Sequence, residues 1–198
     1  MNNIRLNRMT LSPAVWSAIS PGGIQPFVGD DDFVVGSITD ADAGELNAIV
    51  RYLQPKIVAE VGTYVGRSTR AIAAAMPSGE IYTCDLNNTI KLDIWSPTVW
   101  QFPGQSSTTM FASLIERKIQ PDMFYIDGRL TDEDASLMRE LNSGAVIVLD
   151  DFEGIEKGVS NAAMLLSSAF YKHLMIYPRP GGKTAIMLPI HMLQLTAQ

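Results

Sequence analysis

The stretch VAEVGTYVGRSTRAIA, residues 58–73, decides the fold of this protein. Its first residues are apolar and typical of a buried strand, whereas RSTRAIA is typical of a helix, so Gly62 and Gly66 lie in the turn between the two. A strand that runs through a glycine turn into a helix is the usual way to build a nucleotide pocket. The glycine spacing differs from the G-x-G-x-x-G of dinucleotide folds, and the turn contains no lysine. The spacing leaves open which ligand the turn accommodates.

On both sides of this turn, apolar strands alternate with amphipathic helices. A helix is expected from the cap Thr39 and its partner Asp42 to Pro55. Further helices are expected at 67–76, 107–118, 131–141 and 155–170, and strands at 56–61, 80–85, 98–102, 122–127, 144–151, 173–178 and 184–190. The last two strands flank RPGGK and form a hairpin. This order predicts an α/β fold, a doubly wound seven-stranded and mostly parallel sheet with a C-terminal antiparallel hairpin.

The 198 residues suit one domain with a substantial core. Residues 1–36 are a poorly periodic lead-in with the turn signals SPGG and QPF. Scattered aromatic residues in it, Trp16, Phe27 and Phe33, predict that it packs onto the body, and a position over the site is one option. The regular pattern starts at Ser37, so residues 37–198 are expected to form the ligand-binding domain.

Composition narrows the classes of function. No apolar run approaches the roughly 20 residues that cross a bilayer, and the N-terminus lacks the apolar core of a secretion signal, so a cytoplasmic protein is expected. The net charge of −6 without a basic run argues against a dedicated nucleic-acid surface. The single cysteine, Cys84, excludes an internal disulfide and a cysteine zinc cluster. It is most simply a small core residue, with a reactive thiol as the alternative.

Acidic residues follow three of the expected strands. Asp85 ends the second strand, where an acid can bind both hydroxyls of a ribose, whether of an adenosyl ligand or of NAD. Asp127, Asp150 and Asp151 end the fourth and fifth strands, and strand neighbours about 4.8 Å apart bring such carboxylates together. Oxygen ligands suit magnesium first, then manganese or calcium. Alternatively, Asp150 or Asp151 caps the next helix and Asp127 faces the cofactor.

This set of features resembles the class I S-adenosylmethionine-dependent methyltransferases. The resemblance is nearest to the small O-methyltransferases related to catechol O-methyltransferase and to a bacterial family with IDG and DD strand ends, and it covers residues 37–190. It rests on EVGTYVG, on FYIDG and VLDDF, and on the order of elements. It implies that EVGTYVG is the first cofactor motif and that Asp127, Asp150 and Asp151 hold a divalent metal that binds a substrate hydroxyl.

S-adenosylmethionine has no phosphates, which explains the absence of a pyrophosphate cradle. Gly62 would let the backbone approach the ligand, and Gly66 would let the helix start close to the strand. Glu60 would accept a hydrogen bond from the methionine ammonium, directly or through water. The remaining expected contacts are Tyr64 as a wall, Ser68 for the carboxylate, Gln105 and Ser106 for adenine, and Asp127.

The sequence departs from these families after the first aspartate. In IDGRLT, Arg129 and Leu130 stand where the bacterial family has an acid and a histidine, and where the catechol enzymes have a lysine three residues after the first ligand. Arg129 can stabilise an anion but not remove a proton, so it is a candidate catalytic residue of that kind only. Weaker candidates for a base are Lys157, Glu153, His173 and His191.

The predicted function is methyl transfer from S-adenosylmethionine to an oxygen of a small molecule. A non-catalytic S-adenosylmethionine-binding domain is the alternative, and an NAD-dependent oxidoreductase is less favoured because its motifs are absent. The acceptor pocket is expected from the N-terminal segment and from the loops near Trp95 and Phe152. Met187 and Met192 are read as core or as an association surface, which leaves a homodimer as a further expectation.

Overall fold

The computed structural model describes residues 4–6, 11–28, 34–87, 91–94, 97–168 and 174–195. The expectations for Phe33, Trp95 and His173 fall outside these described residues.

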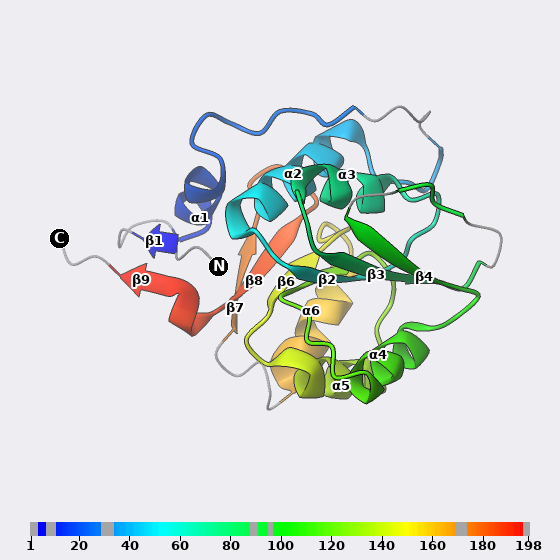
Figure 1. Cartoon of the computed structure of the whole chain (residues 1–198). Helices are drawn as coiled ribbons and strands as arrows, with labels where there is room; N and C mark the ends of the chain where they lie inside the picture. Colours follow the sequence, from blue (N-terminus) through cyan, green and yellow to red (C-terminus); the bar gives the residue numbers. More distant parts are fainter. Residues whose placement is uncertain are drawn as a thin grey trace.

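A twisted seven-stranded sheet runs through the middle of the molecule (Figure 1). Its strands are β2 (Ile57–Val61), β3 (Glu80–Asp85), β4 (Thr98–Pro103), β5 (Met123–Ile126), β6 (Val146–Leu149), β7 (Leu174–Pro178) and β8 (Ala185–Pro189). They lie in the order β4-β3-β2-β5-β6-β8-β7, and only the pairings of β8 with β6 and β7 are antiparallel among the described residues. The predicted α/β class, the seven strands and the C-terminal hairpin are confirmed.

Helices cover both faces of this sheet (Figure 1). α2 (Asp40–Leu53) and α3 (Arg67–Ala75) lie on one face, and α4 (Ser107–Glu116), α5 (Asp132–Asn142) and α6 (Gly158–Ser167) on the other. Successive strand residues point to opposite faces, so β6 gives Val146 and Val148 to the core under α2 and α3, and Ile147 and Leu149 to the core under α4 to α6. Burial on both faces explains why the strands are almost continuously apolar.

Two helices begin as the sequence predicts. Thr39 accepts a hydrogen bond from the backbone N–H of Asp42, whose carboxylate accepts in return from the backbone of Thr39. Thr131 and Asp134 form the same reciprocal pair at the start of α5. Each pair satisfies N–H groups that a helix start leaves without a partner, which fixes where the chain leaves the preceding loop.

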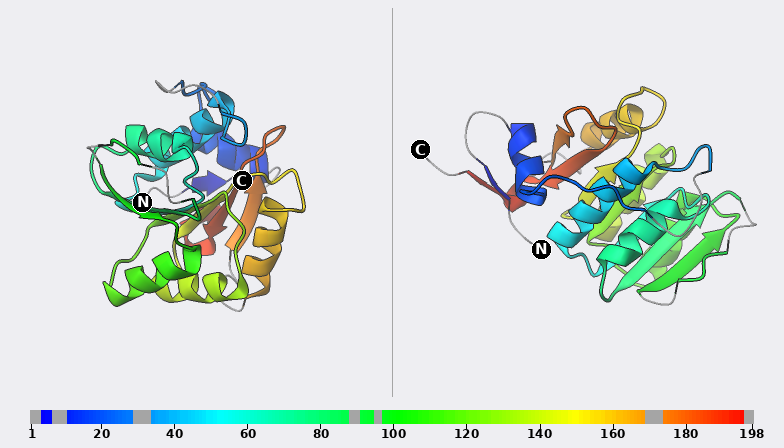
Figure 2. Two further views of the ribbon diagram at one scale, coloured as in Figure 1. Left: turned by 90° about the vertical axis from the view of Figure 1, so that its right-hand side faces the viewer. Right: turned by 90° about the horizontal axis from the view of Figure 1, so that it is seen from above.

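The N-terminal part contains elements that the sequence did not predict. Helix α1 (Leu11–Ile19) packs through Trp16 against the core, and the Trp16 indole N–H donates to the carbonyl of Tyr177 in β7 at 3.3 Å. Strands β1 (Ile4–Leu6) and β9 (Leu193–Leu195) form a separate parallel pair beside α1, at the β7 side of the molecule (Figure 2). A short 3₁₀ helix (Ile190–Met192) connects β8 to β9.

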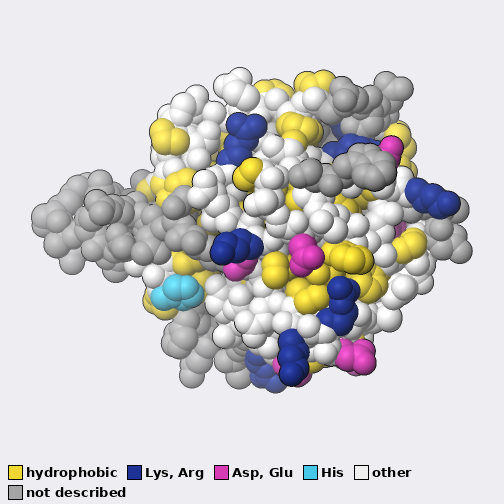
Figure 3. Space-filling model, in the orientation of Figure 1, with side chains coloured by type: hydrophobic (Ala, Val, Ile, Leu, Met, Phe, Trp, Pro, Cys, Tyr) yellow, Lys and Arg dark blue, Asp and Glu magenta, His cyan; other side chains and the backbone are white. Residues whose placement is uncertain are grey.

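The two tail methionines belong to the core. Met187 is fully buried and Met192 is 1% exposed, which decides between the two interpretations of these residues. On the face shown in Figure 3, basic side chains are scattered among acidic and apolar ones rather than gathered into one broad patch. None of the helices in the described part of the chain combines the length and apolar character of a membrane span.

Candidate functional site

Two clefts open at the carboxyl ends of the parallel strands. The first has a volume of about 330 Å³ and is lined by Val61, Gly62, Cys84, Asp85, Leu86, Gln105, Ser106, Ser107, Thr108, Gly128, Arg129, Thr131 and Asp134. The second, of about 300 Å³, is lined by Gly36, Ser37, Ile38, Thr39, Asp42, Asp127, Asp150, Asp151, Lys157 and Lys183. A small hollow between them touches Gly62 on the side of the first cleft and Asp127 on the side of the second. The ends of β2 and β5 therefore separate two sites of small-molecule size.

The glycine turn after β2 has the sharp bend that its sequence predicts. Gly62 has a φ of 100°, and its N–H donates to the carbonyl of Cys84 at 3.0 Å. A Cβ on Gly62 would lie 3.2 Å from the backbone nitrogen of Gly128, so the turn and the loop after β5 are in close contact. Gly66 has a φ of 81°, but a Cβ there would meet the side chain of Leu92. The nearest neighbour of Gly66 is therefore Leu92, and the expected start of the helix close to the strand stays a prediction.

Glu60 is fully buried beneath this turn. One of its carboxylate oxygens accepts from the hydroxyl of Ser68 and the other from Thr69, each at 2.5 Å. Burial raises the pKa of Glu60, and the hydroxyl hydrogen bonds oppose that rise. Ser68 thus points to Glu60, and because its hydroxyl donates to that carboxylate, it can donate to the carboxylate of a ligand only if this hydrogen bond breaks. No pattern in the sequence indicated Thr69, because a threonine inside a helix is common for many reasons.

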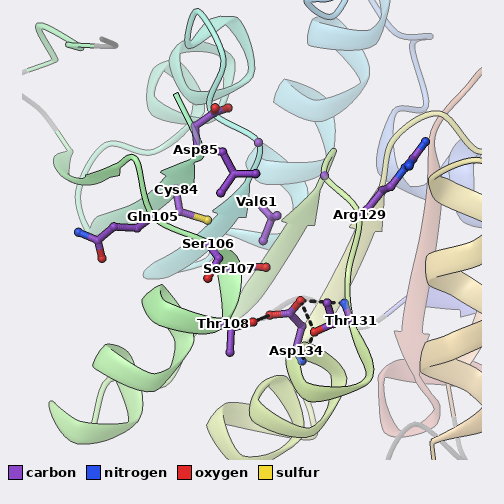
Figure 4. A pocket seen from close by; sticks show the side chains of 13 residues that line it. Val61, Cys84, Asp85, Gln105, Ser106, Ser107, Thr108, Arg129, Thr131 and Asp134 are labelled. Atoms are coloured by element: carbon purple, nitrogen blue, oxygen red, sulfur yellow. Dashed lines mark hydrogen bonds between the residues drawn. The ribbon is translucent and has the colours of Figure 1, made fainter. Parts of the chain in front are cut away.

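Asp85 lines the first cleft at the end of β3 (Figure 4). Its two carboxylate oxygens accept from the backbone N–H groups of Tyr64, at 2.7 Å, and Asn87, at 2.8 Å. Each carboxylate oxygen can accept a second hydrogen bond, so the group can still bind ribose hydroxyls. The N–H from Tyr64 also ties Asp85 to the glycine turn. Tyr64 itself is 36% exposed, has a φ of 44°, and donates its hydroxyl to the carbonyl of Val35 at 3.0 Å.

The opposite wall of the first cleft consists of Gln105 to Thr108 and the start of α5 (Figure 4). Ser106 caps α4 by accepting from the N–H of Thr109 at 3.2 Å. The buried carboxylate of Asp134 accepts from the hydroxyl of Thr108 at 2.9 Å, in addition to its bonds with Thr131. The sequence predicted Gln105 and Ser106 here, and it missed Thr108 and Asp134, which come together only through the packing of α4 on α5.

Cys84 lies at the floor of the first cleft but is only 2% exposed. Burial, followed by the nearby carboxylates of Glu60 and Asp85, raises the pKa of its thiol to about 12. A thiol in this environment stays protonated, which favours the interpretation of Cys84 as a core residue over that of a reactive nucleophile.

Asp127, Asp150 and Asp151 gather in the second cleft. One oxygen from each carboxylate lies within 4.8 Å of the others. This convergence requires the chain to turn after β6, and Asp151 has a φ of 50°, which turns its side chain to the same side as Asp150. Burial, and after it the charges of Asp127 and Asp151, raises the pKa of Asp150 to about 8.

Lys157 lies between two of these aspartates. Its Nζ donates to Oδ1 of Asp127 at 2.8 Å, to the Asp127 carbonyl at 3.2 Å and to Oδ2 of Asp151 at 2.6 Å. Burial lowers the pKa of Lys157, but the hydrogen bonds to both carboxylates outweigh that effect and raise it above its ordinary value. The all-oxygen set suits a hard cation. In this arrangement, however, the ammonium already bridges two of the three expected ligands, so the residues as placed do not fit a divalent ion.

The structure does not bring Arg129 into the aspartate cluster. Arg129 borders the first cleft, but its side chain is 73% exposed and its guanidinium lies 3.6 Å from Glu156. The role expected for Arg129 with an anionic substrate therefore has no support from its geometry. Its neighbour Leu130 is 6% exposed and fills the core under α4 to α6. Leu130, one of the two residues that depart from the family pattern, is thus a packing residue.

The other candidates for a base lie apart from the cluster or are engaged elsewhere. Glu153 pairs with Lys183 at 2.9 Å. His191 is exposed and lies beside Gly144. Gly144 precedes β6, so His191 is at the amino ends of the strands, whereas the aspartates are at the carboxyl ends. Phe152 packs against the core rather than lining the second cleft.

A model of the methyltransferase domain family matches residues 59–152. A comparison with curated proteins finds no matching sequence. The O-methyltransferase TomG of Streptomyces achromogenes, solved with S-adenosylmethionine, superposes with a TM-score of 0.55 at 17% identity over 77% of this chain and 81% of TomG. An O-methyltransferase of Bacillus cereus with S-adenosylhomocysteine gives 0.56 at 15% identity over 78% and 84%. The Podospora anserina methyltransferase PaMTH1, also with S-adenosylhomocysteine, gives 0.51 at 13% over 77% and 79%. These similarities confirm the predicted resemblance in fold.

Proposed function

We propose that this protein transfers the methyl group of S-adenosylmethionine to an oxygen of a small molecule, because residues 59–152 match the methyltransferase domain family and the fold is similar to that of O-methyltransferases. The observation that carries this proposal is the pair of clefts separated by Gly62 and Asp127. A donor in the first cleft and an acceptor in the second meet at this boundary, and alignment is the main requirement of such a transfer.

The residues of the first cleft fit an adenosyl ligand. Asp85 binds the ribose hydroxyls through the acceptor capacity that its two backbone hydrogen bonds leave free. Gln105 and Ser106 face the adenine, and Gly62 allows the backbone to approach the sulfonium because no Cβ intervenes. Tyr64 and Ser68 border the small hollow against which the methionine end lies, above the buried Glu60. Asp127 lies on the acceptor side of the same hollow.

When bound, S-adenosylmethionine supplies an activated methyl group whose bond to sulfur breaks, with the electron pair remaining on sulfur, as the acceptor oxygen bonds to the carbon and its proton passes to water. The protein aligns the two partners. The second cleft offers carboxylates that accept hydrogen bonds from hydroxyl groups, so a neutral, hydroxyl-bearing acceptor suits it better than an anion. The proposed transfer does not use a divalent metal, because Lys157 already bridges Asp127 and Asp151.

Calorimetric titration with S-adenosylmethionine, S-adenosylhomocysteine and NAD tests the donor. We expect the two adenosyl compounds to bind and NAD not to bind; binding of NAD alone would overturn the proposal. Transfer from donor labelled in the methyl group is then measured with panels of phenols, polyols and amines. Labelled methyl ethers support an oxygen acceptor, labelled amines refute it, and donor binding without any transfer identifies a non-catalytic domain.

A further inference from the structure

Lys157 uses its whole hydrogen-bonding capacity on the aspartate cluster. An ammonium has three N–H donors, and Nζ has three acceptors: Oδ1 of Asp127 at 2.8 Å, its carbonyl at 3.2 Å, and Oδ2 of Asp151 at 2.6 Å. The side chain of Lys157 is 33% exposed and that of Asp127 is 14% exposed, so these bonds are partly shielded from water. The contact is therefore stronger than an ordinary surface ion pair.

The backbone around Lys157 is fitted closely to the loops that carry the aspartates. A Cβ on Gly158 would lie 2.4 Å from the carbonyl oxygen of Asp150, so the start of α6 rests directly on the turn after β6. Asn161, one turn along α6, accepts from the N–H of Leu130 at 3.0 Å and donates to the carbonyl of Gly128 at 2.8 Å. The same helix start thus contacts both aspartate-bearing loops, which fixes the position from which Lys157 reaches the cluster.

Three carboxylates this close together repel one another strongly in a partly buried site, so a cation is needed if more than one of them is to stay ionised. Either a bound divalent ion or a positively charged side chain can meet this need. Lys183 also lines the second cleft, but it pairs with Glu153. Among the described residues, Lys157 is the cation in contact with the cluster.

We propose that Lys157 takes the place of a divalent metal ion in this site, so that the protein carries the cation of its acceptor cleft within its own chain and needs no metal. The absence of a metal requirement rests on the function proposed above, whereas the exclusion of metal from the aspartates does not. Lys157 acts in this role as a positioning residue, because its ammonium holds Asp127 and Asp151 in place and has no N–H left for the acceptor.

Binding of Mn²⁺, followed by the electron paramagnetic resonance signal of the free ion, tests the exclusion of metal without any substrate. The wild type is expected not to bind, whereas Lys157→Met frees the carboxylates of Asp127 and Asp151 beside that of Asp150 and should gain affinity for Mn²⁺ by at least about tenfold. The double variant K157M/D127N should lose that gain. K183M is the matched control, since it removes a lysine of the same cleft that does not contact the aspartates, and it should stay like the wild type.

Lys157→Arg keeps the charge and should continue to exclude Mn²⁺, and it serves as the rescue variant if K157M is poorly folded. Tight Mn²⁺ binding by the wild type that disappears in Asp151→Asn would overturn the proposal, and so would a K157M protein that binds no better than the wild type. Once an acceptor is known, wild-type transfer should resist EDTA, and K157M should lose at least about tenfold of its rate and recover part of it with Mg²⁺. A wild type without any transfer counts against the proposed function alone, because the Mn²⁺ measurement stands independently.

Discussion

Asp85 has two duties at once, because the carboxylate that faces the first cleft also holds the backbone of Tyr64 and Asn87. We expect Asp85→Asn to weaken S-adenosylmethionine binding by about 10- to 100-fold, the range that corresponds to losing charged hydrogen bonds of roughly 1.5–3 kcal/mol. Isothermal calorimetry measures this change. Asp122→Asn is the matched control, because Asp122 accepts from the backbone N–H groups of Lys56 and Ile57 at the far edge of the sheet. An equal loss of affinity in both variants would refute a direct role for Asp85.

Glu60 should make the stability of the protein dependent on pH. Its pKa in the folded state is raised by burial above the ordinary value of 4.5, so the folded state holds the proton more tightly than the unfolded state. The stabilising contribution is complete below about pH 4.5 and declines as pH rises towards the folded pKa. Glu60→Gln removes this decline, and its unfolding free energy relative to the wild type should increase from pH 5 to pH 8. Urea denaturation at both values checks this, and a difference that does not change with pH would disprove it.

At the scale of single residues, the sequence predicted the acidic residues that follow the strands. Asp85, Asp127, Asp150 and Asp151 follow apolar runs, and the structure places all four at the predicted edge. Lys157 was predicted only as a weak candidate for a base, and its contact with the aspartates was not predicted. Lys157 follows Asp127 by 30 positions in the chain, and no local pattern indicates that its ammonium reaches back to that carboxylate.

The start of α6 is the element on which the aspartate cluster depends. Gly158→Ala would put a Cβ 2.4 Å from the backbone oxygen of Asp150, and backbone atoms on both sides cannot yield cheaply. We expect a loss of about 1–3 kcal/mol in unfolding free energy, despite the higher helix propensity of alanine. Gly154→Ala is the control in the same loop, because a Cβ there meets nothing within 4 Å. Equal stabilities of the two variants, measured by chemical denaturation, would contradict the close fit of this helix.

The elements between Asp40 and Pro189 follow the sequence within a few residues at each end. Capping pairs and apolar runs are local signals, and here they agree with the tertiary fold. Helix α1 was not predicted because LSPAVWSAI has no clear polar face. Strands β1 and β9 have three residues each and pair across nearly the whole length of the chain, so no local pattern reveals them.

At the scale of the whole molecule, we propose that the N-terminal segment and the sheet unfold as one unit. Trp16 of α1 is buried against the core and bonded to β7. Trp16→Ala should therefore lower the global unfolding free energy by about 3–5 kcal/mol in a single transition. Trp100→Ala, at a tryptophan that is 42% exposed on β4, should cost less. A separate early transition in W16A, with the main transition unchanged, would show that the lead-in is an independent piece. The expected homodimer and cytoplasmic location stay predictions.

The hydrogen bonds of Asp134 connect the first cleft to the contact between α4 and α5. The carboxylate of Asp134 caps the start of α5, accepts a hydrogen bond from the Thr108 hydroxyl in α4, and borders the first cleft. A ligand bound in the first cleft therefore restrains the contact between the two helices. Binding should slow hydrogen–deuterium exchange of the amides of α4 and α5 more than that of the amides of α2 on the opposite face. Mass spectrometry after brief deuterium labelling measures this change. With S-adenosylmethionine bound, deuterium uptake should fall along α4 and α5, including at residues that the ligand does not touch.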